Sequence, residues 1–152
     1  MQWHRTLRRH TALRAIQPFE EYITEGIVTK QHPDRSRADH LKKEATETEA
    51  FLHQIIGSFG ITDNNANTII KLAYDVIMER IRAEMISKGY NAAGRGAHEA
   101  EVAYMRVLQF SEHDVQFCDQ LRYLRNGIVY YGKSFDNEYA KKVVAFMKRV
   151  GR

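Results

Sequence analysis

The apolar residues of this chain recur every three or four positions over most of its length, and this spacing predicts helices. In residues 111–134 they follow one another at intervals of four, three, four and three positions: Phe117, Leu121, Leu124, Ile128 and Tyr131. Ser111, with Asp114 three positions later, matches a helix N-cap, and Gly132 suits the left-handed conformation of a C-cap. We therefore expect one amphipathic helix from Ser111 to Tyr131.

The same periodicity predicts helices in the rest of the chain. We expect a first helix from about Thr11 to Thr29, or from nearer Gln17 because Pro18 fits poorly inside a helix. Further helices are expected from Arg35 to Gly57 or Gly60, from Thr62 or Asp63 to beyond Met85, at 97–109, and from about Asn137 to Val150 after an Asp136 cap. No alternating strand is expected, and the glycine-rich residues 89–96 should form a loop. The predicted fold class is all-α, an up-and-down helical bundle of about five helices. Residues 37–152 would form the bundle, and residues 1–36 a basic, helical N-terminal extension.

Composition limits the function classes only broadly. The chain has 152 residues and a net charge of +4, which is compatible with binding nucleic acid but not diagnostic of it. Arg5, Arg8, Arg9 and Arg14 precede any acidic residue and could contact phosphates. Cys118 is the single cysteine and adjoins the apolar stripe, so we expect a packed thiol. No apolar run reaches membrane-spanning length, and we expect a cytoplasmic protein.

One face of the predicted helix 111–131 is not needed for the core. Asn126 lies opposite the apolar stripe, and Tyr130, four residues later, shares its face. Tyr123 lies near them, and Arg125 falls at the edge of the stripe. An amide, aromatic rings and an arginine on a non-core face indicate an interface or a binding cleft, and the alternative is a partly exposed tyrosine face without function.

The same residues also match a phosphate-binding string. Gly127, Gly132, Lys133 and Ser134 fit G-x-x-x-x-G-K-[ST], in which backbone amides surround a phosphate. That loop needs a strand before it and a helix starting at the lysine, whereas the preceding residues have helical periodicity. We expect the match to be coincidental. His98-Glu99 begins a zinc-protease motif, but Val102 breaks it, and we expect neither a metal nor a cofactor.

Three segments resemble the HEPN family, the helical domain named for higher eukaryotes and prokaryotes nucleotide-binding. They are LAYDVIMERIRAEMISKGY, AHEAEVAYM and LRYLRNGIVYYGKSFDNEYAKKVVAFM, and the resemblance covers roughly residues 37–150 in order. The most specific features are KGY at the end of one helix, HEA at the start of the next, and RN followed by an aromatic pair and glycine. The chain looks most like the standalone prokaryotic and archaeal members.

The resemblance implies a bundle of four to five helices that forms a homodimer. Active members are metal-independent ribonucleases with an R-x(4–6)-H motif facing its copy across a cleft at the dimer interface. Arg125 matches the motif arginine and Asn126 the polar residue after it, while Tyr130 stands at the place of the histidine. No histidine follows His113. A free tyrosine ionises near pH 10, so we expect Tyr130 to donate hydrogen bonds or to stack on a base.

The resulting hypothesis is an RNA- or nucleotide-binding protein whose cleft lies at the dimer interface. Its expected binding residues are Arg122, Arg125, Asn126, Tyr130 and Tyr131, and the first catalytic candidates are Arg125, Asn126 and Tyr130. The family often pairs with a nucleotidyltransferase in toxin–antitoxin operons, which makes such an enzyme the expected partner. The alternatives are an active metal-independent ribonuclease toxin, or a non-catalytic helical dimerisation module.

Overall fold

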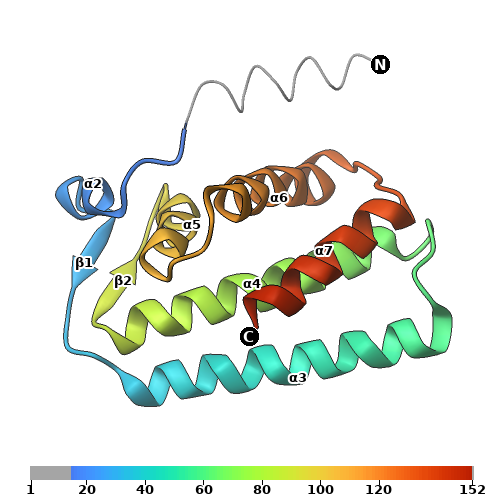
Figure 1. Ribbon diagram of the computed structural model, residues 1–152, viewed down its shortest axis with the longest axis horizontal. Helices are drawn as coiled ribbons and strands as arrows, with labels where there is room; N and C mark the ends of the chain where they lie inside the picture. Colours follow the sequence, from blue (N-terminus) through green and yellow to red (C-terminus); the bar gives the residue numbers. More distant parts are fainter. Residues whose placement is uncertain (1–14, 152) are drawn as a thin grey trace.

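A computed structural model describes residues 15–151, and these residues form a helical bundle with a small sheet at one end (Figure 1). The elements are α2 (Phe19–Thr24), β1 (Val28–Lys30), α3 (Arg35–Phe59), α4 (Ala66–Ser87), β2 (Tyr90–Ala92), α5 (Ala97–Val107), α6 (Glu112–Tyr131) and α7 (Asn137–Val150). The predicted all-α class is confirmed.

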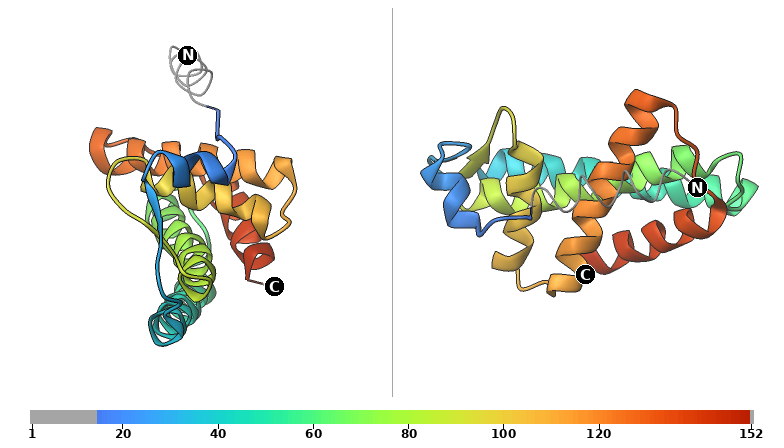
Figure 2. Two further views of the ribbon diagram at one scale, coloured as in Figure 1. Left: turned by 90° about the vertical axis from the view of Figure 1, so that its left-hand side faces the viewer. Right: turned by 90° about the horizontal axis from the view of Figure 1, so that it is seen from above.

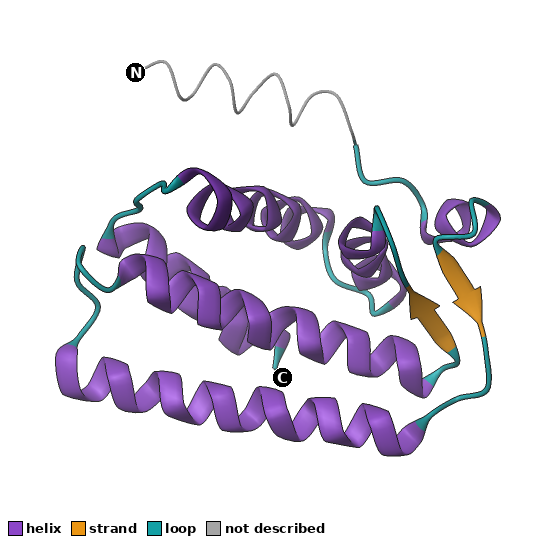
Figure 3. Ribbon diagram, turned by 180° about the vertical axis from the view of Figure 1, so that it is seen from behind, coloured by secondary structure: helices purple, strands orange, loops and turns teal. Residues whose placement is uncertain are grey.

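The long helices α3 and α4 lie side by side along the molecule, as the views in Figures 1 and 3 show. Helix α7 packs on α4 as well, and α5 and α6 cover the side of α4 away from α3. Seen from above, α6 runs across the direction of α4 rather than along it (Figure 2). Because α6 crosses α4, its side chains can reach solvent on both flanks of the crossing.

Helix α4 occupies the centre of the bundle and is buried nearly all around. Seven of its apolar side chains larger than alanine are at most 1% exposed: Ile69, Ile70, Val76, Ile77, Ile81, Met85 and Ile86. A wide apolar arc such as that of this segment suits a central helix, and α4 contacts α3, α5, α6 and α7. Burying one such side chain contributes roughly 1.5–3 kcal/mol, so α4 supplies much of the stability of the fold.

Three polar side chains cap helices, and two of them, Ser111 and Asp136, are the predicted caps. Asp34 accepts a hydrogen bond from the backbone N–H of Arg37 at the start of α3. Ser111 and Asp136 accept equivalent bonds at the starts of α6 and α7. Each cap satisfies a backbone donor that has no partner within its helix.

The predicted caps of α4 are corrected by the structure. Asn65, rather than Thr62 or Asp63, is the N-cap residue. Thr62 and Asn65 instead bond each other's backbone N–H groups in the preceding turn. The Asp63 carboxylate accepts hydrogen bonds from the backbone and side chain of Asn137, so it supports the start of α7. Of the two glycines predicted to end α3, Gly60 is the C-cap, since the helix continues past Gly57 to Phe59.

The predicted first helix from Thr11 to Thr29 is wrong in its described part. Residues 11–14 lie outside the described residues, and the helix that follows spans only Phe19–Thr24. Pro18 disfavours a helical conformation at the residue before it, which prevents an earlier start within the described chain. Gly26 has a φ of +78°, and β-branched residues follow it in strand β1. Ile16, Phe19, Tyr22 and Val28 from this segment are buried in the main core.

The expectation of no strand is also wrong. Strands β1 and β2 pair antiparallel, with Val28 opposite Ala92 and Lys30 opposite Tyr90, and β2 lies inside the predicted loop 89–96. Gly89, just before β2, has a φ of +85°, and a Cβ there would collide with the carbonyl oxygen of Gln31. A three-residue strand shows too little alternation to be recognised in sequence, since its pairing depends on backbone groups.

Candidate functional site

Helix α6 carries the residues that the sequence singles out, and its apolar stripe is shorter than predicted. Leu121, Leu124 and Ile128 are buried, and Phe117 packs edge-on against Phe146 of α7 with ring centroids 4.8 Å apart. Tyr131 does not continue the stripe, because its side chain is 75% exposed. The last turn of α6 extends beyond the apolar surface that α4 and α7 offer, so Tyr131 remains in solvent.

Cys118 takes the structural role predicted for it. The thiol is fully buried in the main core. Burial raises the pKa of this thiol to about 12, which keeps it protonated at neutral pH. A buried, protonated thiol is a packing group and not a nucleophile.

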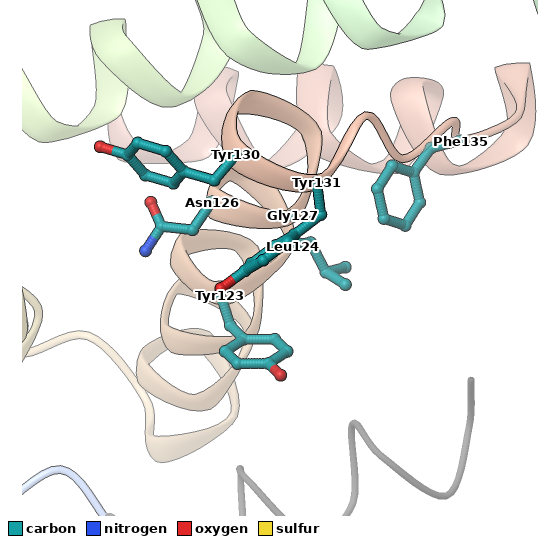
Figure 4. Close-up of a pocket in the computed structure, with 7 residues that line it drawn as sticks. All are labelled: Tyr123, Leu124, Asn126, Gly127, Tyr130, Tyr131 and Phe135. Carbon is teal, nitrogen blue, oxygen red and sulfur yellow. The ribbon is translucent and has the colours of Figure 1, made fainter. Parts of the chain in front are cut away.

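An open pocket of about 310 Å³ lies on the outer side of the last turns of α6 (Figure 4). We call it the aromatic pocket, and its lining residues are Tyr123, Leu124, Asn126, Gly127, Tyr130, Tyr131 and Phe135. Most of this lining is aromatic, and Asn126 adds an amide that can both donate and accept hydrogen bonds. The predicted sharing of one non-core face by Asn126 and Tyr130 is therefore present in the structure.

Asn67 of α4 holds the loop that carries Phe135 to this pocket. Its side-chain amide donates to the carbonyl of Lys133 at 2.6 Å, and its amide oxygen accepts from the backbone N–H of Phe135 at 2.9 Å. The backbone N–H of Lys133 donates to the carbonyl of Gly127 at 3.3 Å. Asn67 and Phe135 could not be predicted as site residues, since no local sequence pattern indicates a contact between residues this far apart in the chain.

Arg125 does not line the aromatic pocket. Its guanidinium extends toward α4, where Nη2 lies 3.9 Å from Oδ1 of Asp75 and Cζ lies 5.6 Å from the centre of the Tyr74 ring. Its Nε is buried without a hydrogen-bond partner. Burial raises the pKa of the Asp75 carboxyl, and the positive charge of Arg125 opposes that rise.

Arg122 is separated from the aromatic pocket as well. It donates from Nε and Nη2 to Oδ1 of Asp119 at 3.0 and 2.9 Å, and Nη2 lies 3.8 Å from Oε1 of Glu99 on α5. These contacts connect α6 to α5 and occupy the guanidinium. Of the predicted binding residues, the structure thus brings together Asn126, Tyr130 and Tyr131 in one pocket and leaves both arginines outside it.

A second, smaller hollow of about 90 Å³ contains Arg125 and lies between α4, α5 and α6. We call it the charged hollow, and its lining residues are Tyr74, Asp75, Met78, Glu79, Arg82, His98 and Arg125. Glu101 lies beside it, almost completely buried, and accepts hydrogen bonds from Arg82 at 2.8 and 3.2 Å. His98, which sequence analysis assigned no role, approaches Glu101 with its Nδ1 at 3.3 Å from Oε1.

The structure excludes the phosphate-loop interpretation of residues 127–134. Gly127 lies inside helix α6, Gly132 is its C-cap, and the next helix begins only at Asn137. A phosphate loop requires a strand before it and a helix beginning at its lysine, and neither is present here. The string GIVYYGKS is a helix end followed by a short connection.

Within residues 15–151, no helix is both long and apolar enough to cross a membrane. The same part of the chain contains no group of three or more His, Cys, Asp or Glu side chains arranged to hold a metal ion. Comparisons of this chain with protein-family models, with curated protein sequences and with solved structures found no match.

Proposed function

We propose that this protein is a HEPN-type helical domain that binds RNA or a nucleotide in the aromatic pocket. The observation that carries the proposal is the pocket itself, in which tyrosine rings surround the Asn126 amide on the surface of a basic protein. Aromatic side chains on a surface offer platforms on which bases stack, and each stacked base contributes about 1–3 kcal/mol. The amide can bond the polar edge of a base, as a nucleotide site requires.

The exposure of the tyrosines supports a ligand or partner rather than a packing role. Tyr130 and Tyr131 are 71% and 75% exposed, and Val129 beside them is 45% exposed. Large apolar side chains gathered on one surface mark interaction sites more often than isolated ones do. The proposal assigns this end of α6 to a cleft between two copies of the chain, with a nucleotidyltransferase of a toxin–antitoxin pair as the expected partner.

The volume of the pocket limits what it binds. About 310 Å³ is at the lower end of the range for small-molecule sites, so one base with its sugar is the expected occupant on a single copy. Neither arginine of α6 lines the pocket, so base stacking and the Asn126 amide, rather than a guanidinium–phosphate pair, would provide its affinity.

The test is fluorescence anisotropy with labelled single-stranded RNA and competing mononucleotides. We expect Tyr130→Ala and Tyr131→Ala each to weaken binding about 5- to 150-fold, which corresponds to the loss of one stacked base. Phe51→Ala is the matched control, since Phe51 is an exposed aromatic residue on α3, outside the pocket. Wild-type protein that binds neither RNA nor nucleotide would contradict the proposal.

Sedimentation of the same variants separates binding from dimerisation. If Tyr130→Ala dissociates a dimer and no nucleotide binds to the wild type, the aromatic face serves only a protein interface. If nucleotide binding is lost in a variant whose sedimentation matches the wild type, the face contacts the ligand directly.

A further inference from the structure

The residues that line the aromatic pocket include no lysine or arginine, so the pocket itself offers no cation to the phosphates of an RNA strand. Contacts with phosphates nevertheless provide much of the affinity of proteins that bind single-stranded nucleic acid. A protein that binds RNA in this pocket therefore needs a basic surface close to it. Helix α7 begins at the pocket, because Phe135 lines the pocket and Asp136 is the N-cap of α7.

Helix α7 differs from the other described helices in its charge. Four of its residues are basic and only Glu138 is acidic, whereas lysines and arginines do not outnumber acidic residues in any other described helix. The basic residues are Lys141, Lys142, Lys148 and Arg149, and all four are exposed. Seven residues make about two turns of an α-helix, so the two pairs lie on the same side of α7. We call these four residues the α7 basic face.

The opposite side of α7 is fixed against the bundle. Val143, Phe146 and Met147 are buried, and α7 packs against α4 (Figure 1). A helix that binds a membrane surface places its apolar side chains in the lipid, and those of α7 are already used in the core. The exposed side therefore suits a polyanion that is recognised by charge alone, and a phosphate backbone fits it better than a lipid bilayer does.

The cations of the α7 basic face can reach a ligand. Among the described residues, no carboxylate pairs with Lys142 or Lys148. The side-chain nitrogens of Lys141 and Arg149 lie 3.2 and 2.9 Å from a carboxylate oxygen, and both side chains remain 54% exposed. Exposed ion pairs contribute little to stability, so a phosphate can replace either carboxylate at small cost. Ala145 is exposed between the two basic pairs, and its short side chain lets a strand approach the helix closely.

We propose that the α7 basic face binds the phosphate backbone of the RNA strand whose base occupies the aromatic pocket. This inference rests on the proposed function, since it takes RNA as the ligand. The pocket holds one base, and the strand continues past Phe135 along the outer side of α7. Lys148 lies seven residues after Lys141, which is about 10 Å along the helix axis, so the face is long enough to contact more than one phosphate.

The experiment measures the affinity of the full chain for a labelled single-stranded RNA of mixed sequence at several salt concentrations, with uncharged nucleosides as competitors. Lys142→Gln combined with Lys148→Gln should reduce the slope of log affinity against log salt concentration by about 0.7 for each lysine, because each phosphate contact releases counterions. A tenfold drop in salt should therefore widen the difference from the wild type about 5-fold per lysine. Competition by nucleosides should be unchanged, since a nucleoside has no phosphate and only the pocket binds it.

The matched control is Lys30→Gln combined with Lys43→Gln, which changes the net charge by the same amount. Both lysines are exposed and lie on β1 and α3, outside the α7 basic face. This variant should keep the wild-type slope, because the slope depends on the phosphates that the protein contacts and not on its net charge. Circular dichroism should show the wild-type helix content in both variants, since all four substituted side chains are exposed.

The outcomes separate this inference from the proposed function. A wild-type slope in the variant of Lys142 and Lys148 overturns the inference and leaves base binding in the aromatic pocket. An equal loss of slope in the control variant overturns it as well, because net charge alone would then explain the binding. RNA binding that needs the α7 lysines, persists in Tyr130→Ala and resists nucleosides would contradict the aromatic pocket and support the α7 basic face. Lysine-dependent binding to vesicles of phosphatidylcholine and phosphatidylserine, without binding of RNA, would assign the face to a membrane and overturn the inference.

Discussion

The two sides of helix α6 differ in the kind of chemistry they offer. The aromatic pocket is open, built mostly of uncharged rings, and its Tyr130 and Tyr131 are largely exposed. The charged hollow is small, and its side chains come from α4, α5 and α6 and bond one another. Arg125 and Asn126 are neighbours in sequence, yet they line different hollows, because successive side chains of a helix point about 100° apart around its axis.

Residues that are adjacent in a sequence motif therefore need not belong to the same site. The residues of a motif such as Arg-Asn followed by an aromatic pair lie on several faces of one helix. Packing of the neighbouring helices determines which of these faces are exposed to solvent. Helix α4 covers the side of Arg125, whereas nothing among the described residues covers the side of Tyr130. Substitutions on the two sides should therefore have separable effects on stability and on binding.

The largest expected effect is on the free energy of unfolding, and it distinguishes the buried stripe of α6 from the exposed end of that helix. Leu121→Ala should reduce the free energy of unfolding by about 2–5 kcal/mol, because the side chain is completely buried and its loss leaves a cavity. Tyr131→Ala should change it by less than about 0.5 kcal/mol, since that ring is in solvent. Urea denaturation of the two variants measures both values, and a similar loss in each would place Tyr131 within the packed stripe.

Much of the fold could be predicted because the signals are local. Helix periodicity located α3 to α7, and Ser111 and Asp136 marked helix starts through bonds to backbone groups three residues away. The sheet could not be predicted, since β1 pairs with a segment far along the chain and each strand has only three residues. Tyr131 was misassigned because periodicity shows which face a residue occupies, but not where the neighbouring helices end.

The candidate site could be predicted only in part for the same reason. Asn126 and Tyr130 share a face of one helix, so their spacing alone brought them together. The cluster of His98, Glu101 and Arg125 joins two helices through contacts that depend on how α5 packs against α6. No spacing rule relates His98 to Arg125, so the sequence alone gave His98 no role at this site.

Removal of Glu101 should test the rigidity of the charged side. Glu101→Ala removes the carboxylate that accepts two hydrogen bonds from Arg82, and losing hydrogen bonds to a charged group costs about 1.5–3 kcal/mol. Tyr130→Ala, on the aromatic side, should stay within about 0.5 kcal/mol of the wild type. Thermal unfolding followed by circular dichroism compares them. Equal stability of the two variants would contradict the view that the charged side is held by its own contacts.

The smallest expected effect is a difference in pH dependence between two aspartates. Burial raises the pKa of Asp75 above its ordinary value of 3.8, despite opposing charges from Arg125, Arg82, His98 and Lys71. A raised pKa means that the folded state binds the proton more tightly, so the stability from this group is present at low pH and is lost as pH rises through the folded pKa. Asp75→Asn should therefore gain stability relative to the wild type from about pH 4 to about pH 7.

Asp63 provides the opposite case on the same protein. Its hydrogen bonds from the backbone and side chain of Asn137 lower the pKa of its carboxyl, so its contribution is present above the unfolded pKa and is lost as pH falls. Because that loss occurs at and below the unfolded pKa of about 3.8, Asp63→Asn should lose stability relative to the wild type as pH rises to about 4, and the difference should stay constant at higher pH. Urea midpoints from about pH 2 to about pH 7 would show the two variants moving in opposite directions, Asp63→Asn below about pH 4 and Asp75→Asn above it. If both move the same way, the charge of Asp75 is stabilised by its arginines more than burial disfavours it, and the charged hollow holds an ionised carboxylate beside Arg125.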